Sequence, residues 1–300
     1  MSDVLLTRQL LAAGIEPGDL RNRTRSGSLL HLRRGAYADP LDRTVYERHL
    51  LLIEAAVSLA DSESVVSFGS AGVLHDLPIR PAEIDLVHLT RKRNSGGRIK
   101  PGIHVHVAPL EGSEVDEVLG MPVTSLDRTV VDLARSSPFA HAVAAGDVAA
   151  RQGMDLAAVA EQLDRAKRRR GASKARRVAR IIDSRSESVG ESFSRVRIIE
   201  QGLPLPELQV EFNGPDGFLA VVDFFWPEYD LIGEFDGKVK YGRLLRPGED
   251  PGDAVFREKQ REDRLRDMGF IVVRWTWDDL MHPERLAARI RRAIDMAREL

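Results

Sequence analysis

Two apolar runs near the end of the chain carry charged residues where a strand would favour valine or isoleucine. The stretch AVVDFFWPEYDLIGEFDGKVKYG, residues 220–242, contains Asp223, Glu234, Asp236 and Lys238. Charged groups close to a protein core are unfavourable unless they are paired or bind a cation. The fold around this stretch therefore has to supply partners for these four side chains.

The expected strands would bring these side chains together. Side chains alternate across a strand, so Glu234, Asp236 and Lys238 are expected on one face. Asp223 lies near the end of the preceding strand, and an antiparallel hairpin would place it beside Glu234. Mg²⁺ or Mn²⁺ with oxygen ligands would relieve the repulsion between the two carboxylates and activate water for attack on a phosphodiester. We expect Asp223 and Glu234 to bind this metal and Lys238 to orient the water or stabilise developing charge.

The elements around the stretch predict an α/β sandwich over residues 186–300. A helix is expected from about Gly190 to Glu200, and strands at LQVEF, LAVVDFFWP, YDLIGEFDGKVKY and FIVVRWTW. A charged helix, DAVFREKQREDRLRDMGF, precedes the last strand, and an amphipathic helix closes the chain. Basic residues on the charged helix are expected to include phosphate contacts. They are Arg257, Lys259, Arg261 and Arg264.

Landmarks in this domain follow a fixed order: Glu191, Gln209, Asp223-Phe224, Glu234-Phe235-Asp236-Gly237 and, after the charged helix, Val273-Arg274. This order resembles the PD-(D/E)xK nuclease superfamily and, more closely, the very-short-patch-repair-like endonucleases. The resemblance implies a Mg²⁺- or Mn²⁺-dependent endonuclease. Its catalytic residues would be Glu191, Gln209, Asp223, Glu234, Asp236 and Lys238.

The acidic motif departs from the family pattern and leaves two interpretations open. If Glu234 is the second acid, Asp236 occupies the position of the family's lysine. If Asp236 is that acid, Lys238 completes D-x-K and Glu234 becomes a third carboxylate. We favour Asp223 and Glu234 as the metal pair. The alternative without chemistry makes Asp236-Gly237 a turn and Lys238 a surface residue.

Glu191 and Gln209 each have a structural alternative. Ser188 and Glu191 have the spacing of a capping box, so Glu191 would close the start of a helix if it does not act at the site. Gln209 would either contact a metal-bound water or pair within the sheet.

The first 42 residues predict a winged helix-turn-helix. A short helix through Leu5–Leu10 is stopped by Gly14 and Pro17, and a second helix, Leu20–Ser26, follows. The segment SLLHLRRGAYAD then predicts two strands around a tight turn. In such a fold the second helix enters the major groove and the hairpin lies along phosphates, whereas the alternative is a solvated basic hairpin. The expected DNA-binding residues are Arg21, Arg23, Arg25, Arg33 and Arg34.

Residues 43–164 are expected to form an α/β middle domain. Val45–Ala60 has the pattern of an amphipathic helix, and mixed strands and helices follow. Thr124 and Asp127 have the spacing of a capping box, so Thr124 is interpreted as a helix start. Another helix is expected over residues 139–163.

Short motifs of this half, TRQLLAAG, LRRGAYAD, SFGSAGVLHDLP and TSLDRTVVDLAR, resemble AbiEi-type antitoxins of type IV toxin–antitoxin systems. The resemblance spans residues 4–150. It implies a winged helix joined to an α/β domain, repression of the protein's own promoter, and a cognate toxin as a partner.

Alternating His104 and His106 share one face of an expected strand, a pattern that can chelate a metal. Because no third ligand stands at a convincing spacing, we favour a solvated strand face. His75 and His88 are interpreted as isolated histidines.

The nine Lys and Arg residues between Arg165 and Arg180 fall in a segment, residues 165–185, that we interpret as a basic linker. A solvated helix face and a nucleic-acid contact are the other interpretations of this charge run.

The composition narrows the class of protein. Three hundred residues predict two or three domains, and 43% hydrophobic residues suffice for real cores. The absence of cysteine excludes disulfide scaffolds, zinc ribbons and thiol nucleophiles. No apolar run approaches the length of a membrane span, and the first residues lack a signal-peptide pattern, so we expect a cytoplasmic protein.

Together these features predict an α/β multidomain (α+β) protein that binds nucleic acid, most simply DNA. Its expected activity is metal-dependent endonucleolytic cleavage of phosphodiester bonds. The alternative is a DNA-binding regulator or antitoxin whose nuclease fold is inactive, and the missing lysine at the standard position favours it.

Overall fold

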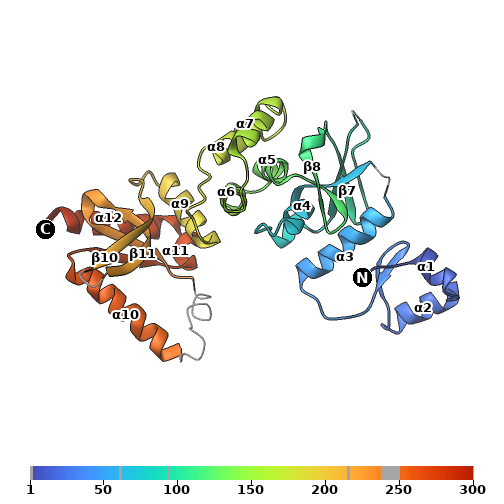
Figure 1. Ribbon diagram of the computed structural model, residues 1–300, viewed down its shortest axis with the longest axis horizontal. Helices are drawn as coiled ribbons and strands as arrows, with labels where there is room; N and C mark the ends of the chain where they lie inside the picture. Colours follow the sequence, from blue (N-terminus) through green and yellow to red (C-terminus); the bar gives the residue numbers. More distant parts are fainter. Residues whose placement is uncertain (1–2, 61–62, 94, 215–216, 238–250, 300) are drawn as a thin grey trace. The chain divides into compact units, whose positions relative to one another are not determined.

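Contacts within the chain divide it into two units, Met1–Ile182 and Asp183–Leu300, each with its own sheets and core. The computed structural model describes residues 3–60, 63–93, 95–214, 217–237 and 251–299. For residues 251–258 it describes the backbone and not the side chains. Both units are mixed α/β, which confirms the expected α/β multidomain (α+β) class (Figure 1). In the described part of the chain, no helix is long and apolar enough to cross a membrane.

The first unit begins with a small three-stranded antiparallel sheet of order β1-β3-β2. Its strands are β1 (Leu5–Leu6), β2 (Leu30–Arg33) and β3 (Ala36–Ala38). Between β1 and β2 the chain forms the helices α1 (Thr7–Ala12) and α2 (Pro17–Arg25). The first helix starts later than expected because Leu5 and Leu6 pair with β3. The second starts earlier, since proline is well tolerated in the first turn of a helix.

A six-stranded mixed sheet of order β6-β7-β5-β4-β9-β8 forms the centre of this unit. Its strands are β4 (Ser64–Val66), β5 (Val87–Arg91), β6 (Arg98–Lys100), β7 (Ile103–Val107), β8 (Val115–Val118) and β9 (Met121–Thr124). The helices α3 (Val45–Ser58) and α4 (Phe68–Leu74) pack against it through a buried core. The core stabilises the sheet because it removes apolar side chains from water.

Four further helices pack around one of their number, α5, which contacts α4 (Figure 1). They are α5 (Leu126–Ser136), α6 (Phe139–Arg151), α7 (Leu156–Arg165) and α8 (Ala172–Ala179). Ser125, not Thr124, caps α5, because its side chain accepts a hydrogen bond from the backbone of Arg128. The single helix expected over 139–163 is two helices, since Gly153 adopts a φ of 91° and Asp155 caps a new start.

The segment interpreted as a basic linker contains α8. Ala172, Ala175 and Val178 are buried, and the helix packs against α5, α6 and α7. The linker interpretation is therefore wrong for this helix, because its small apolar residues form a packed face between the basic side chains.

The second unit has a four-stranded sheet of order β10-β11-β12-β13. The strands are β10 (Glu207–Gly214), β11 (Gly217–Trp226), β12 (Leu231–Phe235) and β13 (Ile271–Trp275). The first three are antiparallel neighbours, and β13 joins β12 in parallel after the long helix α10 (Pro251–Asp267). The helices α9 (Val189–Glu200), α11 (Trp277–Met281) and α12 (Pro283–Glu299) complete the unit.

Candidate functional site

A row of polar side chains crosses the sheet of the second unit from strand to strand. The register of β10 with β11 places Gln209 opposite Asp223, and that of β11 with β12 places Asp223 opposite Glu234. Glu234 in turn pairs with Arg274 on β13. Residues directly opposite each other on paired strands share a face of the sheet. The expected hairpin geometry is thus observed, and it extends to a fourth strand.

An amide group joins the first two carboxylates of this site. The Nε2 atom of Gln209 donates to Oε2 of Glu191 at 2.9 Å and lies 3.5 Å from Oδ1 of Asp223. Gln209 also has a φ of 52°, the left-handed region that non-glycine residues rarely occupy. Such strained positions cost about 1–3 kcal/mol and concentrate at functional sites. Gln209 therefore lies within β10 and directs its amide at both carboxylates, while its contact with a metal-bound water stays a prediction.

Glu191 reaches the row from the first turn of α9. It is 2% exposed, and its carboxylate accepts hydrogen bonds from the backbone of Glu187 and the hydroxyl of Ser188. The Ser188 side chain caps the helix by accepting from the Glu191 backbone. Helix and sheet approach closely here, because a Cβ atom on Gly190 would lie 1.9 Å from the ring of Phe235. Glu191 therefore both closes the helix and contacts the polar row.

Two arginines surround the Glu234 carboxylate, which is 8% exposed. Arg261 on α10 donates to Oε1 at 2.6 Å, and Arg274 lies 3.0 Å from Oε2. Arg274 also lies 3.0 Å from a carboxylate oxygen of Glu262. Positive charge at Glu234, expected from a metal ion, is supplied here by side chains. In the sequence Arg274 is only a landmark of the resemblance, although a charged residue among the apolar residues of FIVVRWTW signals a charged partner.

Asp223 lies inside the row, whereas the other expected site residues that the structure describes lie outside it. Asp223 accepts a hydrogen bond from the backbone of Phe235 at 2.9 Å. Asp236 is half-buried, follows the end of β12, and donates its backbone N–H to Trp275. Lys238 lies outside the described residues, as does the side chain of Arg257. Lys259 and Arg264 are exposed on α10.

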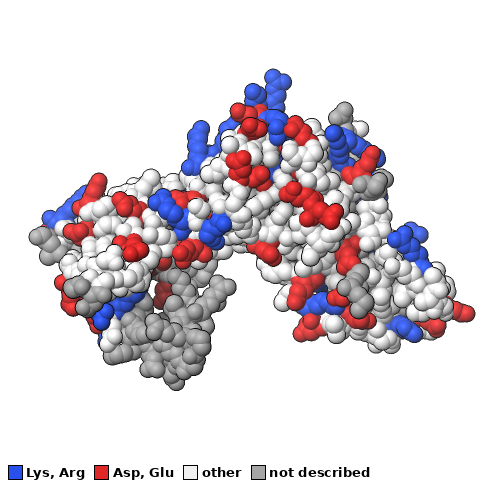
Figure 2. All heavy atoms as spheres, in the orientation of Figure 1, with Lys and Arg blue, Asp and Glu red and all other residues white. Residues whose placement is uncertain are grey.

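Most of the arginines expected to bind DNA lie at the surface of the first unit. Arg21, Arg23 and Arg25 on α2 and Arg34 in the hairpin turn are exposed. Arg33 is half-buried, and burial lowers the pKa of its guanidinium group. Its Nε and Nη1 atoms find no hydrogen-bond partner among the described residues. On the face drawn in Figure 2, basic and acidic side chains are interspersed.

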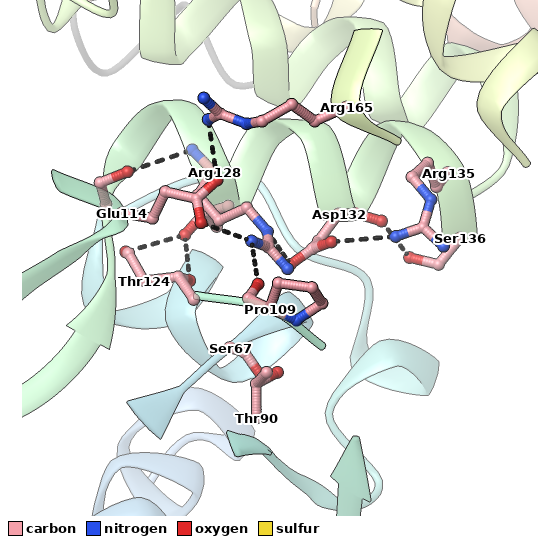
Figure 3. A network of polar contacts seen from close by, with 12 residues as sticks. Ser67, Thr90, Pro109, Glu114, Thr124, Arg128, Asp132, Arg135, Ser136 and Arg165 are labelled. Carbon is pink, nitrogen blue, oxygen red and sulfur yellow. Dashed lines mark hydrogen bonds and ion pairs between the residues drawn. The ribbon is translucent and has the colours of Figure 1, made fainter. Parts of the chain in front are cut away.

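A buried ionic network lies between α5, α7 and the end of the six-stranded sheet (Figure 3). Arg128 is 5% exposed and donates to Asp132 at 3.0 Å, to Glu114 at 3.1 Å and to the Pro109 carbonyl at 3.2 Å. Arg165, from the basic segment, reaches the other Glu114 oxygen at 3.2 Å. Each charge has a partner of opposite sign, so the network is a structural one. The basic segment is thus partly used inside the fold.

The histidines of the first unit are not arranged as expected. Parallel pairing of β5 with β7 places His88 opposite His104, so His88 is not isolated. His106 lies on the same strand face as His104, and both are half-buried. The interpretation of these residues as a solvated strand face is therefore wrong, because the parallel register supplies the third histidine.

Comparison with known proteins identifies relatives along almost the whole chain. No family model matches it. Two Mycobacterium tuberculosis proteins, uncharacterized protein Rv2248 and uncharacterized protein MT2308 from another strain, are each 32% identical over 284 residues, 92% of this chain and 96% of each relative. A crystal structure of the Rv2827c protein from the same organism aligns with a TM-score of 0.40 and 15% identity, over 71% of this chain and 84% of that one. The match covers 92% of the chain, which is more than either unit contains, so both units occur together in the two relatives.

Proposed function

The chain belongs to the family of the Mycobacterium tuberculosis proteins Rv2248 and MT2308, and we propose that it is a DNA-binding, metal-dependent endonuclease. In this proposal residues 186–300 form a PD-(D/E)xK-like domain that hydrolyses phosphodiester bonds. The observation that carries it is the row of Gln209, Asp223 and Glu234 across three strands, with Glu191 added from α9. The activity would be exercised on DNA in the cytoplasm.

The donor groups of the site suit a hard divalent cation, because carboxylate oxygens are the ligands that Mg²⁺ and Mn²⁺ prefer. Asp223 and Glu234 would hold the ion, which when bound polarises the phosphodiester and lowers the pKa of a water ligand. Both Glu234 oxygens lie against arginines, so Arg261, which comes from the neighbouring helix, would have to turn away.

The chain's own residues would then orient the metal-binding carboxylate and stabilise charge on the phosphate. Glu191 holds the amide of Gln209, which in turn faces Asp223 and keeps that carboxylate in place. A released Arg261 and the neighbouring Arg274 present guanidinium groups, which bind phosphate oxygens well. Charge that develops on the phosphate in the transition state would be stabilised by these groups.

DNA binding in this proposal resides in a winged helix-turn-helix at residues 1–42. Helix α2 supplies Arg21, Arg23 and Arg25, and the β2–β3 hairpin supplies Arg34. Arg33 would join these contacts only if its side chain moved outward, because its Nε and Nη1 atoms are buried, and neither has an acceptor among the described residues.

A second candidate function is a DNA-binding regulator or antitoxin that has a cognate toxin and whose nuclease fold is inactive. The pairing of Glu234 with Arg261 and Arg274 favours this candidate, because those ion pairs neutralise the carboxylate without metal. The two candidates share the DNA-binding half and differ in whether the second unit cleaves.

A nicking assay on supercoiled DNA with Mg²⁺ or Mn²⁺ distinguishes them. Wild-type protein should nick, Glu234→Gln should not, and Glu228→Gln, at an exposed position of the same unit, should nick like the wild type. Equal nicking by wild type and Glu234→Gln would place the activity elsewhere. If the wild type binds DNA but cleaves neither DNA nor RNA with either metal, the regulator is the better description.

A further inference from the structure

Three histidine side chains meet on one face of the six-stranded sheet of the first unit. His88 projects from β5, and His104 and His106 project from the adjacent parallel strand β7. The Nδ1 atom of His88 lies 2.9 Å from Nε2 of His106, and one ring nitrogen of each histidine lies within 4.8 Å of the others. Among the described residues, no other three His, Cys, Asp or Glu side chains are gathered this closely.

We propose that His88, His104 and His106 bind a divalent transition metal of the Zn²⁺ class through their ring nitrogens. Three imidazoles are a ligand set used by zinc sites, with a fourth position left for water or another small ligand. Imidazole also suits Cu²⁺, Ni²⁺ and Co²⁺, whereas Mg²⁺ and Ca²⁺ prefer oxygen ligands. This site is independent of the proposed nuclease centre, which lies in the other unit and offers carboxylates.

The distance between the His88 and His106 nitrogens is close to the one that a metal requires, and the third nitrogen lies within 4.8 Å of both. Zinc–nitrogen bonds of about 2.0–2.1 Å in a tetrahedral site separate two ligand nitrogens by about 3.3 Å. The 2.9 Å contact between His88 and His106 therefore needs to open by only a few tenths of an ångström. Their direct hydrogen bond describes the metal-free state, in which one neutral ring donates and the other accepts.

Packing around the rings keeps them neutral and oriented. Burial, with the neighbouring histidines adding to it, lowers the pKa of His106 to about 3 and that of His88 to about 4. At neutral pH a proton does not compete with a metal at these nitrogens. Phe68 stacks on His106 with the ring centroids 4.0 Å apart, although its φ of 51° is a strained conformation for an aromatic residue. The stacked Phe68 ring restrains the orientation of the His106 ring.

A second layer of hydrogen bonds holds the strand that carries His88. The backbone N–H of His88 donates to the hydroxyl of Ser70 at 2.9 Å, and the same hydroxyl lies 2.9 Å from Nε2 of the buried His49. This bond holds the backbone from which the His88 ring projects.

The test is a titration of the metal-free, full-length protein, carrying no polyhistidine tag, with Zn²⁺ followed by calorimetry. We expect one tight site per chain. His104→Gln and His106→Gln should each lower the Zn²⁺ affinity by at least roughly 10–100-fold, because changing even an outer partner of a metal ligand causes a loss of that size. His31→Gln, at an exposed histidine of the same unit, is the matched control and should bind like the wild type. Circular dichroism checks that each variant is folded.

X-ray absorption on the wild-type complex with Zn²⁺ or Co²⁺ keeps the test decisive even if a variant fails to fold. The spectrum should show three imidazole ligands and no sulfur, since the chain has no cysteine. Unchanged Zn²⁺ affinity in His104→Gln and His106→Gln, or a spectrum with fewer than three imidazoles, would overturn the proposal. Asp223→Asn should leave this site unaffected, which separates it from metal binding at the carboxylate row.

Discussion

The guanidinium group of Arg261 donates to Oε1 of Glu234 at 2.6 Å, across the space between α10 and β12. This ion pair occupies the carboxylate that the proposed nuclease centre needs for its metal. Arg261 therefore has two opposing effects in the proposal: it competes with the cation in the resting protein and can bind phosphate once displaced. The two effects can be measured separately.

Replacing Arg261 with Gln should raise the affinity of the second unit for Mn²⁺, because one competing positive charge is removed. The rise in melting temperature that Mn²⁺ produces by mass action should then appear at lower metal concentration. DNA nicking should fall roughly 10²–10³-fold, the scale for losing one group that stabilises transition-state charge. Arg264→Gln, exposed on the same helix, is the control. Mn²⁺ affinity identical to that of wild type in Arg261→Gln would argue against metal binding at Glu234.

Asp223→Asn should abolish the stabilisation by Mg²⁺ or Mn²⁺ and leave the metal-free protein as stable as the wild type or more so. The asparagine oxygen can still accept from the Phe235 backbone, and the change removes one of the negative charges that the row gathers beside Glu191. Thermal unfolding with and without metal measures this. Asp230→Asn is a matched control, because asparagine tolerates the φ of 43° found at that exposed turn. Equal metal-induced shifts in Asp223→Asn and wild type would eliminate Asp223 as a ligand.

Replacing Arg21 and Arg25 together with Ala should weaken DNA binding and lower the salt slope of log K by about 1.8, at about 0.9 per phosphate contact. The two residues lie four positions apart and so share one face of α2, whereas Arg23 lies on another flank. Binding measured between low and moderate salt gives the slope. Arg292→Ala, exposed on α12, should change neither affinity nor slope. A double variant with the wild-type slope would remove α2 from the interface.

The sequence was informative where neighbours in space are also neighbours along the chain. Asp223 and Glu234 could be placed together because β11 and β12 form a hairpin whose alternation of side chains is visible in the sequence. The ion pair of Glu234 with Arg274 depends on a parallel strand that follows α10, so no local pattern specifies it. The meeting of His88 with His104 was missed for the same reason.

Helix α8 illustrates a different limit. Its alternation of basic residues with alanine resembles a solvated or disordered segment, although Ala172, Ala175 and Val178 recur every three residues. Small side chains give a weak apolar signal in the sequence. Here they allow α5 and α6 to pack closely against α8. Gly171 at the start of α8 shows how close, since a Cβ atom there would lie 2.3 Å from the carbonyl oxygen of Arg135 on α5.

Arg128→Met should destabilise the first unit by about 3–5 kcal/mol, the usual cost of removing one partner from a buried ion pair. The change leaves charge on Asp132 and Glu114 with one arginine fewer. Arg128→Lys should not restore stability, because one ammonium group cannot replace the three donations of the guanidinium. Urea unfolding measures the effect. Arg165→Met, with a side chain 44% exposed, should cost less than about 1 kcal/mol, and equal losses in the two variants would refute a buried network.

His49 should make the stability of the first unit depend on pH. The residue is 2% exposed on α3, and burial lowers the pKa of its ring to about 4 from an ordinary 6.5. Its Nε2 atom contacts Ser70, while Nδ1 finds no partner among the described residues, so a second ring proton would be buried without an acceptor. The unfolded chain therefore binds a proton below pH 6.5 that the folded protein accepts only near pH 4.

Stability from this residue is consequently present above the unfolded pKa and is lost as the pH falls from about 6.5 towards 4. Between pH 7 and 4 the loss should be on the order of 3 kcal/mol in the free energy of unfolding. His49→Gln cannot take up that proton, so its unfolding free energy, measured by urea titration at each pH, should fall by correspondingly less. The comparison uses the slope with pH, which is independent of any packing loss common to all pH values. If the stability of His49→Gln falls as steeply as that of the wild type, the His49 ring must take up its proton in the folded protein near its ordinary pKa of 6.5.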